Sequence, residues 1–195
     1  MPTRYPELAE FIKQHSVSRG EFRLASGQFS NYYIDGKNTL AEPEGLRLIA
    51  EAIGRELEGF KVDAIGGLEI GAIYIATAVS LASLAWPKPL RQFTVRKETK
   101  THGSRKRVEG FVPRGEQVAV VDDVVTTGGS VIQAIEAIRE AGCEVAVAIT
   151  LVDRDAGATQ ALARLNVPYR PLLTISDLGL SNEQPSRNEK HRVAS

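Results

Sequence analysis

Hydrophobic residues along this chain recur at two different spacings, and the spacing changes near residue 62. Before that point, apolar residues three or four positions apart predict helices over 4–17 and 43–59, because this spacing places them on one helix face. Between these helices, EFRLAS and NYYID have strand-like composition, and Gly27 supplies the turn of a hairpin over 20–35. Pro43 stands at the favoured first position of the second helix.

After residue 62, short apolar runs alternate with helical segments. The apolar runs are VDAIGG, RQFTV, QVAVVDD and EVAVAITLV, and the helical segments cover 71–84, 130–142 and 159–166. Runs that are apolar on both faces are typical of parallel strands covered by helices. The pattern predicts an α/β fold with a central, mostly parallel sheet flanked by helices. We expect an N-terminal helix and hairpin over 1–40, a core over 41–180 and a frayed polar tail over 181–195.

Length and composition exclude several classes of protein. The chain has 195 residues, of which 43% are hydrophobic and 25% charged, as expected for one globular domain. Cys143 is the only cysteine, which excludes a disulfide framework and a multi-cysteine zinc site, and we expect it to pack as a small apolar residue. Neither a signal peptide nor a bilayer-spanning run is visible, so we expect a cytoplasmic protein with no membrane contact.

The formal net charge is zero, but one stretch of the chain is strongly basic. Residues 88–114 contain nine Lys and Arg against two Glu, a local charge of +7. The neutral total argues against a nucleic-acid-binding domain. The local excess indicates that an anion binds near this stretch.

The segment VAVVDDVVTTGGS, residues 118–130, carries the strongest chemical signal. A buried strand leads into a Thr- and Gly-rich turn, and a helix is predicted from about Ser130. Thr126, Thr127 and Ser130 offer hydroxyl donors, and Gly128 and Gly129 allow the backbone to approach a ligand closely. Because a helix N-terminus presents free N–H groups, this arrangement predicts a phosphate site.

Two adjacent carboxylates, Asp122 and Asp123, end the strand beside that phosphate site. Their mutual repulsion is relieved if they accept hydrogen bonds from a diol or face a divalent cation. A ligand with a phosphate, a ribose diol and a metal ion satisfies both halves of the segment. The alternative is an ordinary acidic strand end followed by a Gly-rich turn.

Residues 96–110, RKETKTHGSRKRVEG, form the predicted basic loop. Arg96, Lys97, Lys100 and His102 lie within seven residues, and the loop is too polar to be buried. We expect it to be mobile and to close over a polyanion whose charge grows during a reaction. A solvated surface loop and a nucleic-acid patch are alternatives, although no aromatic residues interleave to stack bases. A third alternative is that His102 is a core histidine, but its neighbours are too polar for that.

Residues 118–130 resemble the phosphoribosyl pyrophosphate (PRPP) signature of the type I phosphoribosyltransferases. The spacing RKxxKxHG over 96–103 resembles the catalytic loop of the orotate branch of that family. FRLASGQFSNYYID at 22–35 and LVDRDAGA at 151–158 resemble two further segments of the same branch. The resemblance implies the type I phosphoribosyltransferase fold with a small N-terminal hood.

The resemblance also implies a reaction in de novo pyrimidine (UMP) biosynthesis. The phosphoribosyl group of PRPP passes to orotate, giving orotidine 5′-monophosphate and pyrophosphate, and Mg²⁺ is carried by PRPP without direct protein ligands. A homodimer is implied, with the basic loop reaching into the partner's site. The implied catalytic residues are Lys100, His102, Asp122 and Asp123. The implied orotate contacts are Tyr33, Ile34, Thr126 and Arg154. The implied PRPP contacts are Arg96, Lys97, Lys100, His102, Asp122, Asp123, Val124, Val125, Thr126, Thr127, Gly128, Gly129 and Ser130.

The chain departs from the family pattern at three places. Ala25 stands where the hairpin often carries Lys, Asn31 stands where Pro is common, and residues 68–71 lack the Lys that some members have. Both missing lysines would touch PRPP phosphates, so pyrophosphate binding is weaker here or depends on other cations.

Three other functions remain open from the sequence. One is a phosphoribosyltransferase for another base, such as a purine, which base competition would reveal. Another is a regulator that binds PRPP and nucleic acid without catalysis, which salt-dependent binding to nucleic acid would reveal. The third is a structural binding module, which would leave Asp122, Asp123 and the basic loop without a ligand.

Overall fold

The computed structural model describes residues 3–23, 29–97 and 107–181. The helices in these ranges are α1 (Pro6–His15), α2 (Gly36–Leu40), α3 (Pro43–Leu57), α4 (Gly71–Ala82), the 3₁₀ helix η1 (Ser83–Ala85), α5 (Gly129–Glu140) and α6 (Ala158–Ala163). The strands are β1 (Val17–Arg23), β2 (Phe29–Ile34), β3 (Ala64–Leu68), β4 (Arg91–Val95), β5 (Val108–Gly110), β6 (Gln117–Val125), β7 (Glu144–Asp153) and β8 (Tyr169–Thr174). The predicted turn at Gly27, most of the basic loop and nearly all of the predicted tail lie outside the described residues.

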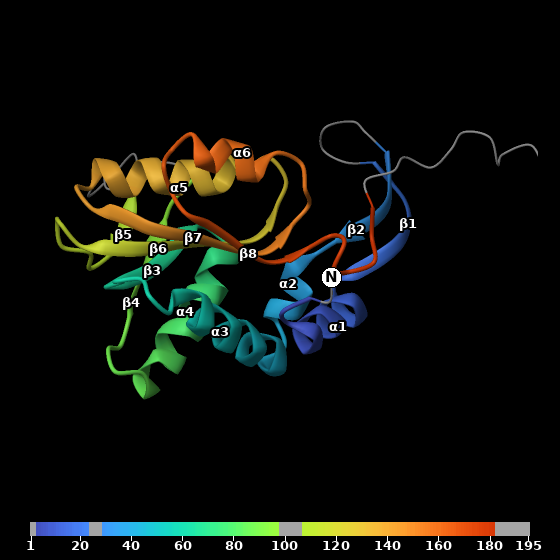
Figure 1. Cartoon of the computed structure of the whole chain (residues 1–195), viewed down its shortest axis with the longest axis horizontal. Helices are drawn as coiled ribbons and strands as arrows, with labels where there is room; N and C mark the ends of the chain where they lie inside the picture. The colour runs from blue at the N-terminus through green and yellow to red at the C-terminus, as the bar shows by residue number, and fades with distance from the viewer. Residues whose placement is uncertain (1–2, 24–28, 98–106, 182–195) are drawn as a thin grey trace, which may run out of the picture.

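The central sheet confirms the predicted α/β class. Its six strands have the order β5-β4-β3-β6-β7-β8, and every neighbouring pair is parallel except β4 and β5. Helices α3 and α4 cover one face of the sheet, and α5 and α6 cover the other (Figure 1). Parallel strands with helices on both faces place their carboxyl ends along one edge, where ligands bind in such sheets.

Strand β6 shows how the sheet builds a core on each face. Side chains alternate along a strand, so Ala119 and Val121 belong to the cluster under α3 and α4, while Val118 and Val120 belong to the cluster under α5. All four are essentially inaccessible to solvent. The doubly apolar pattern therefore reflects burial on both faces, as predicted.

The N-terminal segment forms a small separate sheet in which β1 pairs with β2 in antiparallel fashion. The helix predicted over 4–17 ends at His15, because Val17 begins β1 and pairs with Ile34. Leu8 and Ile12 of α1 belong to the same hydrophobic cluster as the sheet face under α3. The division of the chain at residues 40 and 180 stays a prediction.

Helix α2 is absent from the predicted elements. Its five residues are too few to show a helical period, and its position depends on polar contacts. The Asp35 carboxylate accepts a hydrogen bond from the Lys37 N–H at 3.1 Å, which caps the helix. At its other side, the buried Ser16 and Thr39 hydroxyls are 2.7 Å apart. These contacts join α2 to the end of α1.

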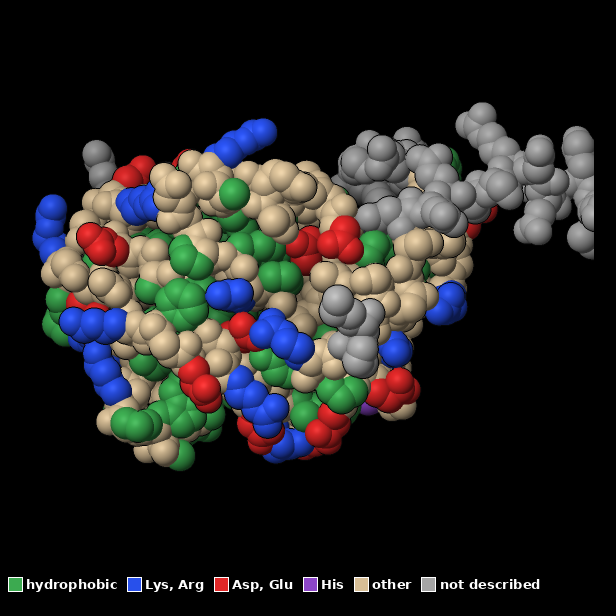
Figure 2. Space-filling model, in the orientation of Figure 1, with side chains coloured by type: hydrophobic (Ala, Val, Ile, Leu, Met, Phe, Trp, Pro, Cys, Tyr) green, Lys and Arg blue, Asp and Glu red, His purple; other side chains and the backbone are tan. Residues whose placement is uncertain are grey.

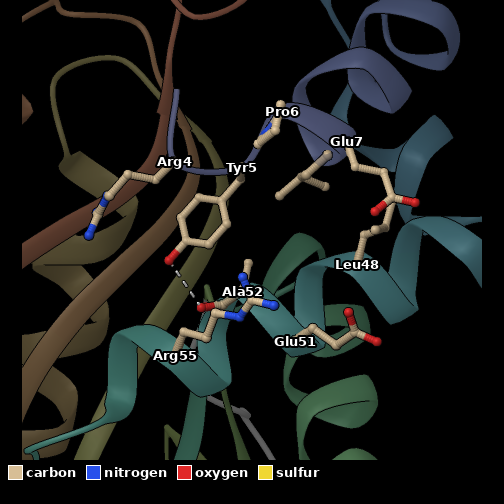
Figure 3. A pocket seen from close by; sticks show the side chains of 9 residues that line it. Arg4, Tyr5, Pro6, Glu7, Leu48, Glu51, Ala52 and Arg55 are labelled. Carbon is tan, nitrogen blue, oxygen red and sulfur yellow. Dashed lines mark hydrogen bonds between the residues drawn. The ribbon is translucent and has the colours of Figure 1, made fainter. Parts of the chain in front are cut away.

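The beginning of the chain is attached to α3 by Tyr5. Its hydroxyl donates to the buried Glu56 carboxylate at 2.5 Å, and the Arg4 guanidinium lies 2.7 Å from the same oxygen. Burial, followed by the Glu56 contact, raises the pKa of Tyr5 to about 12. Figure 3 shows the Tyr5 ring directed from this segment towards the backbone of α3 at Ala52, beside a pocket that none of the predicted site residues line.

Tyr5→Phe is expected to lower the free energy of unfolding by about 1–3 kcal/mol, because it deprives the buried Glu56 carboxylate of a hydrogen-bond donor. Urea unfolding of the variant and the parent measures the difference, and kcat is expected to stay unchanged. An unaltered unfolding midpoint would show that the ion pair with Arg4 is enough to stabilise the buried Glu56 carboxylate without the Tyr5 hydroxyl.

Across residues 3–23, 29–97 and 107–181, no helix combines the length and apolar character needed to span a membrane.

Candidate functional site

The candidate site lies where β3 and β6 end and where α4 and α5 begin. Strand β6 continues through the two aspartates to Val125, two residues further than predicted, and α5 begins at Gly129. Gly71 begins α4, three residues after the end of β3. Because β3 and β6 are parallel neighbours, both helices start at the same edge of the sheet.

The turn over 126–129 leaves the N-terminus of α5 open. Gly128 has φ 85°, a left-handed conformation that favours glycine, and no side chain of the described residues caps the helix. Thr126, Thr127 and Gly129 are exposed. The N–H groups of the first helical turn have no partner within the helix, so they can bind an anion. The predicted phosphate site therefore has the local geometry that it requires.

Asp122 is buried and already hydrogen-bonded within the fold. Its Oδ2 atom accepts a hydrogen bond from the Ser130 hydroxyl, and Oδ1 accepts one from the Asp123 N–H at 2.9 Å. Burial raises the pKa of Asp122 to about 6, the Ser130 hydrogen bond opposes this rise, and the Asp123 charge adds to it. Asp122 thus joins the strand to the first turn of α5.

Asp123 is half-buried and lies between the first residues of two helices. A Cβ atom added at Gly36 would lie 3.2 Å from Asp123 Oδ2, and one added at Gly71 would lie 2.6 Å from Asp123 Cγ. Glycine at position 71 is therefore required for this close approach. No side chain of the described residues caps α4, so its free N–H groups begin beside the Asp123 carboxylate.

Arg154 follows β7 and is held by its backbone and its side chain. Its N–H donates to Val125 O at 2.9 Å, and its guanidinium lies 4.9 Å from the centre of the Tyr32 ring. Tyr32 is buried, whereas the Tyr33 ring is half exposed and packs near Phe22. Ile34 is buried at the end of β2. Of the two tyrosines, Tyr32 is the one that the structure brings to Arg154.

The base of the basic loop is fixed by four contacts. The Arg96 N–H donates to Arg107 O at 2.9 Å, and the Arg96 guanidinium lies 3.1 Å from Glu109. The Lys97 N–H donates to the Glu69 carboxylate at 2.9 Å, and the Glu69 N–H donates to Val95 O at 2.9 Å. Arg96 Nε is buried and has no acceptor among the described residues. Lys100 and His102 lie outside the described residues.

Four residues of this region were missed by the sequence analysis: Gly36, Glu69, Gly71 and Tyr32. Gly36 and Gly71 stand at predicted element boundaries, but nothing in the sequence shows that both contact Asp123. Glu69 was noted only as part of a segment without lysine. Tyr32 had the same signal as Tyr33, since alternation along β2 separates the two but does not say which face meets Arg154.

The raised pKa of Asp122 predicts an acid limb in the pH profile. Below about pH 6 the carboxyl binds a proton and loses its charge, so kcat/KM for a ligand that needs this charge falls as the pH drops. Ser130→Ala removes the hydrogen bond that favours the charged form, so the limb moves to higher pH. Profiles from about pH 5 to pH 8 check both statements. If the acid limb came from titration of the substrate and not of Asp122, it would lie at the same pH in the parent and in Ser130→Ala.

Comparison with known proteins shows what this chain is similar to in sequence and fold. A model of the phosphoribosyl transferase domain matches residues 35–165. The orotate phosphoribosyltransferase of Rhodopseudomonas palustris (strain TIE-1) is 45% identical over 177 residues, covering 87% of this chain and 93% of the relative. That of Corynebacterium glutamicum (strain R) is 43% identical over 175 residues, covering 90% of this chain and 94% of the relative.

Solved structures show the same similarity. The Mycobacterium tuberculosis H37Rv orotate phosphoribosyltransferase in complex with Fe(III) dicitrate has a TM-score of 0.81 and 35% identity, covering 90% of this chain and 99% of that one. Its complex with PRPP has a TM-score of 0.77 and 34% identity, with the same coverage. Adenine phosphoribosyltransferase from Saccharomyces cerevisiae, at 22% identity and a TM-score of 0.65, covers 86% of this chain and shares the fold.

Proposed function

This chain belongs to the orotate phosphoribosyltransferases, with the type I phosphoribosyltransferase fold, and from that premise we propose how its own residues carry out the reaction. The enzyme transfers the phosphoribosyl group of PRPP to orotate in pyrimidine biosynthesis. The bond between the anomeric carbon and the diphosphate oxygen breaks, and its electron pair leaves with the diphosphate. A bond from an orotate ring nitrogen to the same carbon replaces it, and the proton of that nitrogen leaves with the diphosphate.

The open N-terminus of α5 is the observation that carries the PRPP assignment. The 5′-phosphate of PRPP binds its free N–H groups and the hydroxyls of Thr126 and Thr127, which are exposed at this turn. Gly128 is buried, and a Cβ atom added there would lie 3.5 Å from Ala158 Cα, so the turn packs against the start of α6. The same site is shaped by the residues on either side of the turn: Val124 and Val125 at the end of β6, and Gly129 and Ser130 at the start of α5.

The two aspartates have different tasks in this proposal. Asp123 accepts hydrogen bonds from a ribose hydroxyl and lies near the positive charge that develops on the ribose ring. Asp122 is held by Ser130 and by the Asp123 N–H, yet each carboxylate oxygen can accept a second hydrogen bond. Asp122 thus binds the other hydroxyl and fixes the ribose relative to α5.

Mg²⁺ is proposed to arrive with PRPP. Among the described residues, no group of three or more His, Cys, Asp or Glu is placed to hold a metal ion. The Asp123 carboxylate lies between two glycines, so its negative charge would attract a cation carried by PRPP without Asp123 becoming its direct ligand. When bound, the cation neutralises charge on the departing diphosphate.

The basic loop supplies the cations that meet the leaving diphosphate. Lys100 and His102, assigned from the sequence, stabilise charge that appears mainly in the transition state. Arg96 and Lys97 stand at the described base of the loop, and the buried Arg96 Nε is a donor for a phosphate oxygen. Orotate, itself an anion, is held by Arg154, with Tyr33, Ile34 and Thr126 as further contacts.

A homodimer with shared sites is supported by the surface of α4. A helix that is apolar all round is normally buried, and the segment 70–87 carries no charged residue. Ile70, Tyr74, Leu81 and Leu84 lie on one face of this segment and are roughly half or more exposed. Figure 2 shows hydrophobic side chains on the surface near the end of α4 and η1. This face is proposed to pack against a second copy of the chain.

Sharing of sites across the dimer predicts complementation between two inactive variants. Lys100→Ala and Asp123→Asn each lose activity alone, but a mixed dimer has one site with both residues intact. After mixing and subunit exchange, the activity is expected to recover to about a quarter of the parent value. Mixtures that stay inactive would place Lys100 and Asp123 of each site on one chain.

The test of the function is the loss of orotate absorbance with PRPP and Mg²⁺, beside a sample containing a chelator. Metal-dependent loss with equal release of pyrophosphate supports the acceptor, the cofactor and the reaction together. Consumption of PRPP with hypoxanthine or xanthine but not with orotate would contradict the assigned base. A cytoplasmic location stays a prediction of the sequence.

A further inference from the structure

Lys37 stands next to the aspartate that the proposed function places at the ribose. Gly36, its neighbour, lies so close to Asp123 that an added Cβ would be 3.2 Å from the carboxylate oxygen Oδ2. Lys37 is therefore one residue away from a direct contact with the site. Its side chain is 58% exposed, so the ammonium group is accessible to a ligand.

The ammonium group of Lys37 is held among negative charges. Its Nζ atom lies 3.4 Å from Asp35 Oδ1, the same oxygen that accepts the Lys37 N–H. Burial lowers the pKa of Lys37, but the charges of Asp35 and Asp123, the hydrogen bond to Asp35 and the Tyr33 charge oppose it, and the net pKa is raised. Lys37 thus stays protonated, and part of its interaction is with Asp123.

The positions of α2, α4 and α5 around Asp123 indicate which part of the substrate lies near Lys37. The open N-terminus of α5, proposed for the 5′-phosphate, lies on the face of β6 that carries Asp122, because Ser130 of α5 donates a hydrogen bond to Asp122. Gly36 and Gly71, which begin α2 and α4, both contact Asp123. With the ribose at Asp123, the diphosphate on its anomeric carbon is directed away from the α5 phosphate site. It therefore lies towards α2 and α4.

We propose that Lys37 binds the diphosphate of PRPP, together with the free N–H groups at the start of α4. The proposal rests on the proposed function and names a cation for its leaving group. The sequence has alanine at position 25 and no lysine over residues 68–71, so Lys37 supplies a cation that neither of these two places provides. Asp35 holds the ammonium group in the absence of the substrate, and the diphosphate takes its place.

The variant that tests this is Lys37→Met, which keeps the length of the side chain and removes the charge. The KM for PRPP is expected to rise about 10-fold to 100-fold, and pyrophosphate is expected to inhibit less strongly by a similar factor. The KM for orotate is expected to change by less than about threefold. Lys37→Arg keeps a cation and should recover most of the PRPP affinity.

Two controls separate this role from helix capping. Lys13→Met removes an exposed lysine that lies 3.8 Å from Glu10, and it should leave all three constants unchanged. Asp35→Asn removes the ion pair but keeps a capping side chain, so a purely structural role of Lys37 predicts the same PRPP defect in this variant. Such a shared defect, or an orotate-specific effect of Lys37→Met, would overturn the proposal.

Binding measurements without an acceptor base test the role of Lys37 independently of whether orotate is the substrate. Calorimetric titration with PRPP and with pyrophosphate, each with Mg²⁺, compares the parent, Lys37→Met and Lys13→Met without any acceptor. Weaker binding confined to Lys37→Met supports the proposal even if the parent fails to consume orotate. Equal binding by the three proteins contradicts it even if the parent is fully active with orotate.

Discussion

Asp123→Asn is expected to lower kcat/KM for PRPP by about 10²–10³-fold, because the variant loses a full negative charge beside the ribose. The carboxylate lies between Gly36 and Gly71, where an amide of the same shape fits but leaves no charge to balance the developing cation. Steady-state kinetics with saturating orotate measures the loss. The unfolding midpoint in urea is expected to stay close to the parent value.

Asp63→Asn is the matched control for this variant. Asp63 precedes β3 at the amino ends of the strands, where it pairs with Lys88 and accepts the Gln117 N–H. Its replacement should reduce stability and leave kcat/KM unchanged. Normal turnover by Asp123→Asn would remove the ribose role from this residue.

Arg154→Met is expected to lower kcat/KM for orotate by about 10²–10³-fold, since removing one partner of a desolvated charge pair costs several kcal/mol. The guanidinium is placed for this task by the Tyr32 ring and by the bond from its N–H to Val125 O. PRPP binding, measured by calorimetry, should be unchanged. Methionine keeps much of the side-chain length, so the comparison isolates the charge.

Arg164→Met controls for the loss of an arginine near the same surface, because Arg164 is exposed at the end of α6. It should leave both substrates unaffected. Arg154→Lys should recover only part of the orotate affinity, because an ammonium lacks the planar fork of a guanidinium. An equal loss for PRPP and orotate would show that Arg154 supports the fold of the site and not the base.

The sequence predicted the long elements of the fold well, because their periodicity reports burial directly. Strand β4 begins and ends where RQFTV was expected, and α5 starts within one residue of its prediction. Helix α2, strand β5 and strand β8 were missed. Two of these have five residues or fewer, and β8 lies at the sheet edge with exposed and buried positions mixed.

The chemistry of the site was predictable where it is local in sequence. Asp122, Asp123 and the Thr- and Gly-rich turn are contiguous, so the sequence alone was enough to propose them as one site, and their roles stay a prediction. The distinction between the two aspartates was not, because it depends on Ser130 for one and on Gly36 and Gly71 for the other. The latter glycines are separated from Asp123 by many residues and meet it only through packing of α2 and α4.

The backbone bond between Arg96 and Arg107 sets a limit on where the basic loop can act. This bond joins the two ends of the loop, so the ten residues between them must leave from and return to one point. At about 3.3–3.6 Å per residue, the tip of such a loop extends no more than roughly 20 Å from that point. Lys100 stands four residues after Arg96, so its Cα atom reaches no more than roughly 14 Å from Arg96. If Lys100 serves a partner's site, the diphosphate of that site must lie within this distance plus the length of the lysine side chain. The position of the loop base therefore limits the distance between one subunit's loop and the other subunit's site. This limit restricts how two α4 faces can pack against each other.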